Sequence, residues 1–323
     1  HGRKFEGEWR AVSGSPFCEP HRLYKENGFK KKEDAQSLIR FLEEEKPVKA
    51  ELFSIERKKE KKNPPLLFNL AELQNECSRR FKISPDETLR VVQELYEKKL
   101  VTYPRTDARV LSTAVAKEIG RNLGGLKAYG KLSAFAVEVL AGTAWKGIGK
   151  TRYVNDKQIT DHYAIIPTGQ GLGALKSLPP LSEQVYELIA RRFLGIFYPP
   201  AEYQKVQLVT EVRGERFFSG FRVLLAEGYL RVQPQAPDNA QKKKEEDETE
   251  DVGVDAEFLE LLKGLRKGAP IETSGFRIRE GETSPPKRYN SGSIILAMEN
   301  AGQLIEDEEL RAQIKGSGIG TSA

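Results

Sequence analysis

Two helical segments followed by a short apolar run constrain the fold of this chain more than any other feature. The spacing of apolar residues predicts one helix over Leu70–Phe81 and a second over Asp86–Lys99. Ser84 precedes the second helix, with proline next and glutamate three residues on, which is a capping-box signature. The run Leu100–Tyr103 predicts a short strand. Two helices, a turn and a strand together indicate a helix-turn-helix or winged-helix unit. The apolar stripe predicted for the second helix is Leu89, Val92, Leu95 and Tyr96.

The predicted strand ends in a loop whose side chains suit phosphate chemistry. This loop carries Tyr103 and Arg105, flanked by hydroxyl and carboxyl groups. A tyrosyl oxygen can attack a phosphodiester and hold it as a covalent ester. An arginine two residues on can neutralise the non-bridging oxygens through its planar fork of donors. A tyrosine–proline turn on a surface loop is the plainer interpretation, and composition alone favours it.

Composition limits the class of protein. The 323 residues suffice for two or three domains. Lysine and arginine total 52 against 47 acidic residues, so the net charge of +5 permits nucleic-acid binding without demonstrating it. Two cysteines and three histidines argue against a disulfide-dense scaffold and against a cysteine- or histidine-based metal cluster. No apolar run approaches the roughly 18 residues of a membrane span, so we expect no membrane association. The two cysteines fit a location in the reducing cytoplasm.

Further elements are predicted on both sides of the helical pair. Helices are predicted over 32–45, 112–123, 131–141, 182–197, 291–300 and 307–315. Ser182 is the predicted cap of the helix that it begins. Strands are predicted over 5–12, 50–56, 203–212, 216–225, 230–232 and 270–279. The basic run 57–62 leads into Asn63-Pro64-Pro65, which we interpret as a linker. The charged tract 242–251 is interpreted as a solvated surface loop.

A second segment, Asp161–Thr168, sharpens the interpretation of the tyrosine loop. It contains His162, which on its own beside apolar residues is more often structural. The string Thr102–Asp107 resembles the active-site tyrosine motif of type IA DNA topoisomerases. Asp161–Thr168 resembles that family's second motif, histidine-x-alanine-isoleucine-x-proline-threonine. The proline after the tyrosine and the ending Ile-Ile-Pro-Thr resemble the bacterial topoisomerase III branch more than topoisomerase I. Segments 64–74, 288–302 and 318–321 agree in order, so the resemblance spans nearly the whole chain.

The resemblance implies a role for each residue of the two motifs. Tyr103 would be the nucleophile that leaves a 5′-phosphotyrosyl link and a free 3′-hydroxyl. Arg105 would hold the scissile phosphate and stabilise the charge that develops on it. His162 would contact a backbone phosphate or orient an acidic partner, and Asp161 would orient His162. The local positioning groups in this scheme are Thr102, Thr106 and Asp107, the last of them fixing Arg105.

Three further arginines are candidates for binding a DNA strand along a groove. They are Arg79, Arg80 and Arg152. Surface charge without a function is an equal alternative for each of them.

The resemblance also implies the activity, substrate and cofactor of the intact enzyme. The activity is ATP-independent passage of DNA through a transient single-strand break, which relaxes or decatenates DNA. The DNA would be single-stranded at the cleavage site, and we expect a monomer. In this family an N-terminal Toprim domain holds Mg²⁺ with an acidic cluster and supplies a catalytic glutamate and lysine. No Asp-x-Asp-x-Glu string occurs here. We therefore expect an internal fragment that has no metal site of its own and does not relax DNA alone.

The expected architecture is an α+β fold. Residues 63–193 are predicted to form a helical, winged-helix-like domain that carries Tyr103 and His162 together. A discontinuous β-rich domain is predicted from residues 1–62 and 194–284, and the resemblance implies that it arches over a hole wide enough for DNA. Residues 285–323 are predicted to begin a C-terminal helical domain.

Two other functions fit parts of the sequence. In the first, the helical pair is a non-catalytic helix-turn-helix module that reads duplex DNA. The second helix offers Arg90 and Gln93 for this purpose, but its three glutamates would repel phosphate. The second alternative, a scaffold that closes around another protein, draws only on the acidic tract.

Overall fold

The computed structural model describes residues 3–233, 251–253, 256–301 and 319, and the chain divides into two compact units. The first unit comprises His1–Lys62, Ala201–Ala226 and Ala236–Pro285. The second comprises Asn63–Pro200, Glu227–Gln235 and Pro286–Ala323. Each unit is therefore assembled from segments that lie far apart in the sequence.

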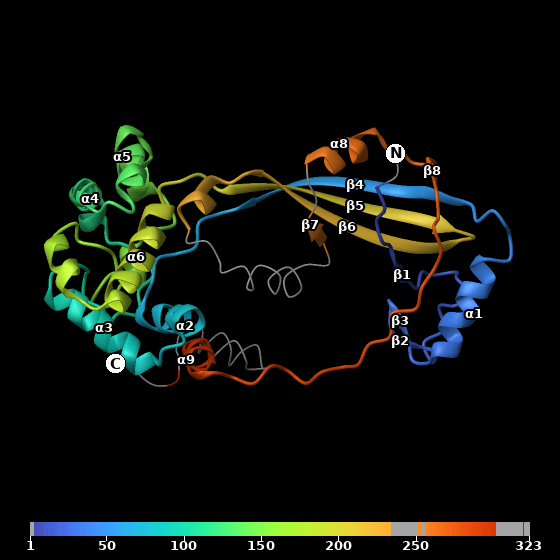
Figure 1. Cartoon of the computed structure of the whole chain (residues 1–323), viewed down its shortest axis with the longest axis horizontal. Coiled ribbons are helices and arrows are strands. Elements are labelled where there is room, and N and C mark those ends of the chain that lie inside the picture. Colours follow the sequence, from blue (N-terminus) through green and yellow to red (C-terminus); the bar gives the residue numbers. More distant parts are fainter. Residues whose placement is uncertain (1–2, 234–250, 254–255, 302–318, 320–323) are drawn as a thin grey trace. The chain divides into compact units, whose positions relative to one another are not determined.

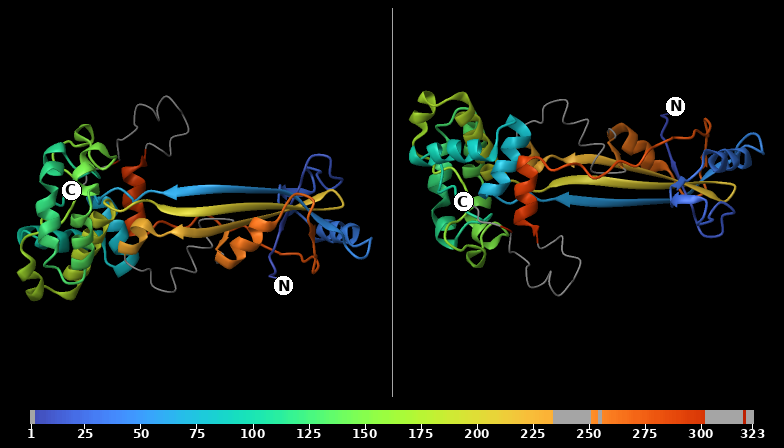
Figure 2. Two further views of the ribbon diagram at one scale, coloured as in Figure 1. Left: turned by 90° about the horizontal axis from the view of Figure 1, so that it is seen from above. Right: turned by 90° about the horizontal axis from the view of Figure 1, so that it is seen from below.

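Three long antiparallel strands form the centre of the first unit, and Figure 2 shows them side by side. They are β4 (Ala50–Lys62), β5 (Ala201–Val212) and β6 (Glu215–Ala226). β5 and β6 form a hairpin whose turn, Arg213-Gly214, has positive φ at both residues, as a tight two-residue turn requires. The short strands of this sheet are β1 (Glu8–Arg10) and β7 (Asp251–Gly253) beside β6, and β8 (Pro270–Ile271) beside β4.

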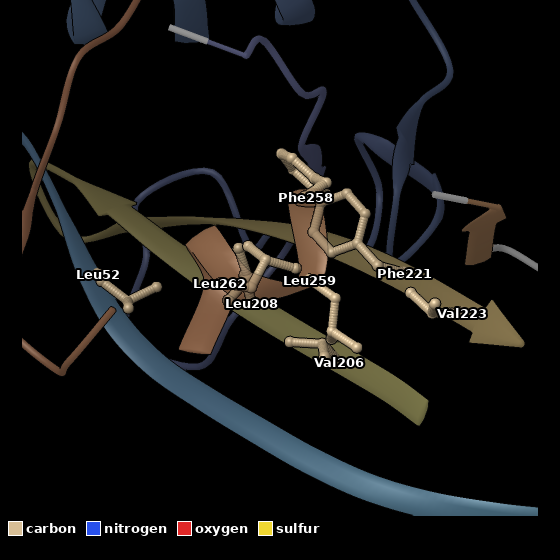
Figure 3. Close-up of a cluster of buried hydrophobic side chains, with 8 residues drawn as sticks. All are labelled: Leu52, Val206, Leu208, Phe221, Val223, Phe258, Leu259 and Leu262. Atoms are coloured by element: carbon tan, nitrogen blue, oxygen red, sulfur yellow. The ribbon is translucent and has the colours of Figure 1, made fainter. Parts of the chain in front are cut away.

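Helix α8 (Ala256–Gly264) packs on one face of this sheet (Figure 1). Strand side chains alternate between faces, so Val206 and Leu208 of β5 point to the same side as Phe221 and Val223 of β6. The buried cluster in Figure 3 joins them to Leu52, Phe258, Leu259 and Leu262. Arg57 of β4 adds a polar contact, because its guanidinium donates to the carbonyl oxygens of Leu262 and Leu265 at the end of α8.

A second cluster in the first unit surrounds helix α1 (Lys32–Leu42). Its buried members are Trp9, Phe17, Leu38, Leu42, Ala50 and Val212. The Trp9 ring stacks on Phe29, whose short strand β3 (Gly28–Phe29) pairs with β2 (Leu23–Lys25). The buried Glu215 carboxylate accepts hydrogen bonds from the Trp9 indole at 2.8 Å and from the Ser15 hydroxyl at 2.6 Å.

The second unit is mostly helical. Its helices are α2 (Leu70–Phe81), α3 (Pro85–Glu97), α4 (Thr113–Leu126), α5 (Ser133–Ala141), α6 (Pro180–Gly195) and α9 (Ser291–Glu299). Isolated β-bridges join its loops at Phe68–Ile165, Val101–Pro167 and Leu111–Val154. α9 packs against α2 at Gly292, where a Cβ atom would lie 2.9 Å from the Asn75 Cα.

The mixed helix-and-sheet architecture confirms the α+β prediction, while the winged-helix description stays a prediction. Leu100–Tyr103 forms a single bridge at Val101 and not a strand. The predicted domain limits also stay predictions. The predicted helix at 307–315 and all but the last residue of the tract 242–251 lie outside the described residues.

Further local predictions are wrong, each for a physical reason. The basic run 57–62 belongs to β4, because β5 pairs with it along its whole length. Residues 230–232 lie in a 3₁₀ turn, Gly228–Val232, in which the Tyr229 amide donates to the Pro199 carbonyl. The strand predicted over 270–279 ends at Ile271 because only two of its residues pair with β4. Helix α6 begins at Pro180, so Ser182 lies inside it and not at its cap.

Candidate functional site

The two sequence motifs meet in the second unit. Helix α3 ends at Glu97, and Lys99, two residues later, has a φ of 60°. From there the chain runs alongside the segment that follows His162, with an isolated bridge between Val101 and Pro167. The Thr102 amide donates to the Ile166 carbonyl at 3.0 Å. The Thr102 hydroxyl donates to the Ala164 carbonyl at 3.0 Å and accepts from the Ile166 amide at 2.9 Å. Thr102 is therefore a bridge between the motifs.

Tyr103 lies at the centre of this junction. Its ring centroid is 4.4 Å from that of His162, with the ring planes tilted by 44°. On α3, the Tyr96 ring makes an edge contact with Tyr103 at 5.4 Å and 82°. Tyr103 is half-buried and His162 is exposed. The structure thus brings together the tyrosine and the histidine that the sequence selected.

Thr106 fixes the backbone of both motifs. Its buried hydroxyl donates to the His162 carbonyl at 2.7 Å and accepts from the Ala108 amide at 3.1 Å. Its carbonyl accepts from the Leu70 amide at the start of α2. Thr106 therefore ties the tyrosine loop to His162 and to α2 and has no free hydroxyl to offer a ligand.

The charged residues of the motifs are exposed. Arg105, Asp107 and Asp161 all face solvent. Within the described part of the chain, the Arg105 and Asp161 side chains make neither hydrogen bonds nor ion pairs. The expected Asp107–Arg105 and Asp161–His162 contacts are therefore not formed among these residues. An exposed, unpaired guanidinium two residues from Tyr103 is available to an anionic ligand.

Arg79 and Arg80, predicted to bind a DNA strand, both engage Glu76 on the same helix. The Arg79 guanidinium approaches the carboxylate with two nitrogens, at 2.6 Å and 3.1 Å, and the Arg80 Nε binds one of the same oxygens. Burial alone would raise the pKa of the Glu76 carboxyl, but the two arginines outweigh it and lower this pKa to about 2. Arg152, in contrast, is exposed and its guanidinium lies 5.8 Å from the Tyr153 ring centroid.

The ion pairs of Glu76 with Arg79 and Arg80 predict that the stability of the protein depends on pH. Because the folded-state pKa of about 2 lies below the ordinary value of 4.5, these ion pairs contribute fully to the unfolding free energy above pH 4.5, and the contribution disappears as the pH falls towards 2. The shift corresponds to about 3 kcal/mol of unfolding free energy. Denaturant unfolding at pH 7 and pH 3 should show a smaller acid-induced loss in Glu76→Gln than in the unchanged protein. Equal losses in the two proteins would contradict this assignment.

Asn69 is a structural part of the site that the sequence reasoning did not select as functional. Its side chain is buried and caps α2 by accepting from the Glu72 amide at 2.9 Å. Its amide group donates to the Asp107 carbonyl at 3.1 Å and to the Glu299 carboxylate of α9. Burial raises the pKa of Glu299. An asparagine directly before a predicted helix was the signal that could have identified this cap.

Two arginines behind the tyrosine loop have structural partners. Arg109 pairs with Glu72 at 2.5 Å and donates to the Leu67 carbonyl. Arg192 lies 3.9 Å from the Phe68 ring centroid and donates to the Leu66 carbonyl at 2.9 Å. Burial lowers the pKa of Arg192 to about 10. Both side chains hold the segment before α2 in place.

The described residues contain neither a cluster of metal-binding side chains nor a helix that could span a membrane. Among these residues, no three His, Cys, Asp or Glu side chains are grouped so that they could hold a metal ion. The Mg²⁺ that the family resemblance implies therefore finds no fitting ligand set in this part of the chain. No described helix is both long enough and apolar enough to span a membrane.

Comparisons with known proteins agree with the motifs. The sequence profile of a family described as DNA topoisomerase matches residues 8–323. DNA topoisomerase 3 of Bacillus subtilis is 34% identical over 292 residues, which cover 88% of this chain and 37% of that protein. DNA topoisomerase 3 of Bacillus licheniformis is 34% identical over 279 residues, covering 85% of this chain and 36% of that protein. The chain thus spans little more than a third of the length of these relatives.

A solved structure supports the same fold. Full-length topoisomerase I from Thermotoga maritima superposes with a TM-score of 0.57 at 23% sequence identity. The match covers 86% of this chain and 41% of that one.

Proposed function

Since this chain belongs to the DNA topoisomerase family, we propose that its Tyr103 cleaves and rejoins one DNA strand through a transient phosphotyrosyl bond. The observation that carries the proposal is the meeting of the two motifs. Tyr103 and His162 are 59 residues apart in the sequence, yet their ring centroids lie 4.4 Å apart. A surface tyrosine–proline turn would not require this neighbour, nor the Thr102 and Thr106 bonds that hold both loops together.

The proposed reaction exchanges one phosphodiester for another. The Tyr103 hydroxyl gives up its proton and its oxygen attacks the scissile phosphorus, so that a bond from phosphorus to this oxygen forms as the bond to the 3′ oxygen breaks. The 3′ oxygen leaves and takes up a proton, so the strand ends in a 3′-hydroxyl. Attack by this hydroxyl on the phosphotyrosyl ester reverses every step and restores Tyr103. Because the ester conserves the energy of the broken bond, the cycle needs no ATP.

The residues around Tyr103 have different proposed roles in the reaction. Arg105 is exposed and unpaired among the described residues, so its guanidinium is free to bind the non-bridging oxygens as their charge increases. His162 contacts a backbone phosphate beside the cleavage site or orients an acidic partner. Thr102 and Thr106 act through the backbone, while Asp107, Asp161 and Arg152 are exposed beside the motifs and stay proposed contributors to strand binding.

Within the described part of the chain, no side chain forms a hydrogen bond with the Tyr103 hydroxyl that could assist its deprotonation. An unassisted phenol is a poor nucleophile at neutral pH. We propose that the help comes from a Toprim domain outside this sequence, whose acidic residues would hold Mg²⁺, the cation that would neutralise charge at the scissile phosphate. The proposed substrate is DNA that is single-stranded at the cleavage site, and the proposed form is a cytoplasmic monomer that relaxes or decatenates DNA.

Because the proposed reaction of Tyr103 depends on a second domain, we expect that the chain alone will not relax DNA. Incubation of the purified 323-residue chain with negatively supercoiled plasmid and Mg²⁺ should leave the distribution of topoisomers unchanged on an agarose gel. The full-length protein that contains this sequence, tested in parallel, should shift the distribution towards relaxed forms. Relaxation by the chain alone would show that its own residues suffice and would reject the dependence on a second domain.

The direct test of the function is a covalent adduct on a labelled oligonucleotide. A 5′-phosphotyrosyl bond attaches the protein to the fragment on the 3′ side of the break. A label at the 3′ end of the strand should therefore stay with full-length protein after denaturation, whereas a label at the 5′ end should not. Transfer of the 5′ label alone would indicate the opposite polarity and reject this mechanism.

A non-catalytic helix-turn-helix module is not favoured. The second helix of the pair, α3, lines an open groove. The charged side chains that α3 contributes to this groove are three glutamates, Glu87, Glu94 and Glu97, and one arginine, Arg90. Three carboxylates on the outer surface of a recognition helix would repel the phosphates on either side of a DNA groove.

A further inference from the structure

We propose that Tyr96 is a positioning residue that holds the Tyr103 ring in the orientation required for attack on the phosphate, an inference that rests on the proposed function. The two rings form an edge contact with centroids 5.4 Å apart and planes at 82°. This geometry is favourable for aromatic pairs, because the positive edge of one ring meets the negative face of the other. The contact involves the proposed nucleophile itself.

The two tyrosines differ in how firmly their backbones are held. Tyr96 lies in the last turn of α3, which is anchored in the core by the buried Val92 and Leu95. The helix is capped at its start by the Ser84 side chain, which accepts from the Glu87 amide. Tyr103 instead lies in a loop. The Tyr96 ring, held by the helix, can therefore restrict the rotation of the Tyr103 ring, whereas a ring on a loop cannot fix the orientation of a ring on the helix.

Tyr103 has a second ring neighbour, His162, at 4.4 Å. With Tyr96 contributed by α3 and His162 by the second motif, two separate elements restrict its side-chain torsions. In-line attack depends on such restriction, because only a narrow range of oxygen positions is productive. Removal of one neighbour should reduce the fraction of molecules in which the Tyr103 oxygen is correctly placed.

The ring of Tyr96, and not its hydroxyl, carries this role. Within the described part of the chain, the Tyr96 hydroxyl makes no hydrogen bond. Tyr96 is 38% exposed, whereas Val92 and Leu95 on the same stripe of the helix are buried. This exposure also means that truncation leaves no closed cavity in the core, so substitution at this position should be tolerated by the fold.

The test compares Tyr96→Leu and Tyr96→Phe in the full-length protein. The phenylalanine keeps the ring, whereas the leucine keeps apolar volume without it. The rate of adduct formation on a 3′-labelled oligonucleotide is measured in a single turnover at saturating protein, and the Kd for the oligonucleotide is measured separately. We expect Tyr96→Leu to form the adduct about 2- to 10-fold more slowly, the range that an aromatic pair contributes. Tyr96→Phe should match the unchanged protein, and all three should bind the oligonucleotide equally.

Each other outcome rejects the proposal in a distinguishable way. Equal rates for Tyr96→Leu and the unchanged protein would show that the contact is not used. A slow Tyr96→Phe would assign the effect to the hydroxyl, and weaker binding at an unchanged rate would assign Tyr96 to DNA contact. Absence of adduct from the unchanged protein would reject the proposed function and this inference together. Unfolding midpoints of the three proteins confirm that rates are compared among folded molecules.

Discussion

Tyr103→Phe in the full-length protein should form no covalent adduct with a 3′-labelled oligonucleotide. The substitution removes one oxygen and leaves the ring, so the contacts with His162 and Tyr96 can persist. Without that oxygen no phosphotyrosyl bond can form. We expect adduct formation to fall by at least about 10⁴-fold, the order of magnitude that follows removal of a catalytic nucleophile.

Tyr163→Phe is the matched control for this experiment. Tyr163 follows His162 directly and is half-buried, but its hydroxyl has no part in the proposed reaction. It should form the adduct at the rate of the unchanged protein. Both variants should bind the oligonucleotide with unchanged Kd, which separates loss of chemistry from loss of folding. Adduct formation by Tyr103→Phe would place the nucleophile elsewhere. If the unchanged protein and both variants bind the oligonucleotide but none forms the adduct, a nucleic-acid-binding module would be favoured over an enzyme.

Local sequence signals predicted the helices well. The helix predicted over Leu70–Phe81 has those limits in the structure. The Ser84 cap predicted for the next helix is present, since the Ser84 side chain accepts from the Glu87 amide at 3.1 Å. Such features depend on residues within one turn of each other, and a single sequence contains that information.

Features that depend on contacts between residues far apart in the sequence were harder to predict. The basic residues 57–62 have no apolar alternation, and only pairing with residues 201–206 of β5 makes them a strand. Tyr96 was predicted to lie on the apolar stripe of its helix, but it is exposed and its ring contacts Tyr103 of the following loop. Helix α8 was missed although Phe258, Leu259 and Leu262 have helical spacing, so there the signal was present and unused.

The candidate site also combines features that local sequence signals predict with features that depend on distant contacts. The motifs identified Tyr103 and His162 as a pair, and their rings are in contact. The scaffold that brings them together consists of hydrogen bonds from the Thr102 and Thr106 hydroxyls to the second motif and of a glycine contact between α4 and Gly169. Neither the Thr106–His162 bond nor the approach of α4 to the second motif follows from residue type or spacing, because both depend on how the loops pack.

That approach occurs at Gly125, and Gly125→Ala should destabilise the protein strongly. Gly125 lies near the end of α4, against the backbone of Gly169, the residue that follows the second motif. A Cβ atom at Gly125 would lie well under 3.0 Å from the Gly169 carbonyl oxygen and Cα, both of them backbone atoms that cannot rotate away. Gly169 is itself packed against the α4 backbone, since a Cβ atom there would lie 2.8 Å from the Asn122 carbonyl oxygen, so it has little room to move away. We expect a loss of about 3 kcal/mol or more in unfolding free energy.

Gly124→Ala is the matched control, because it makes the same change one residue earlier in the same helix. Nothing lies within 4 Å of a Cβ atom at Gly124. Alanine is the better helix former, so this variant should be unchanged or more stable by about 0.5–1 kcal/mol. Denaturant unfolding of both variants, with the slope m compared to confirm the same transition, provides the measurement. The Gly125 variant should also form less adduct, because Thr168 bonds to the Leu100 carbonyl and any shift of Gly169 is transmitted to the tyrosine loop. Equal stability of the two variants would show that α4 does not hold the second motif in place.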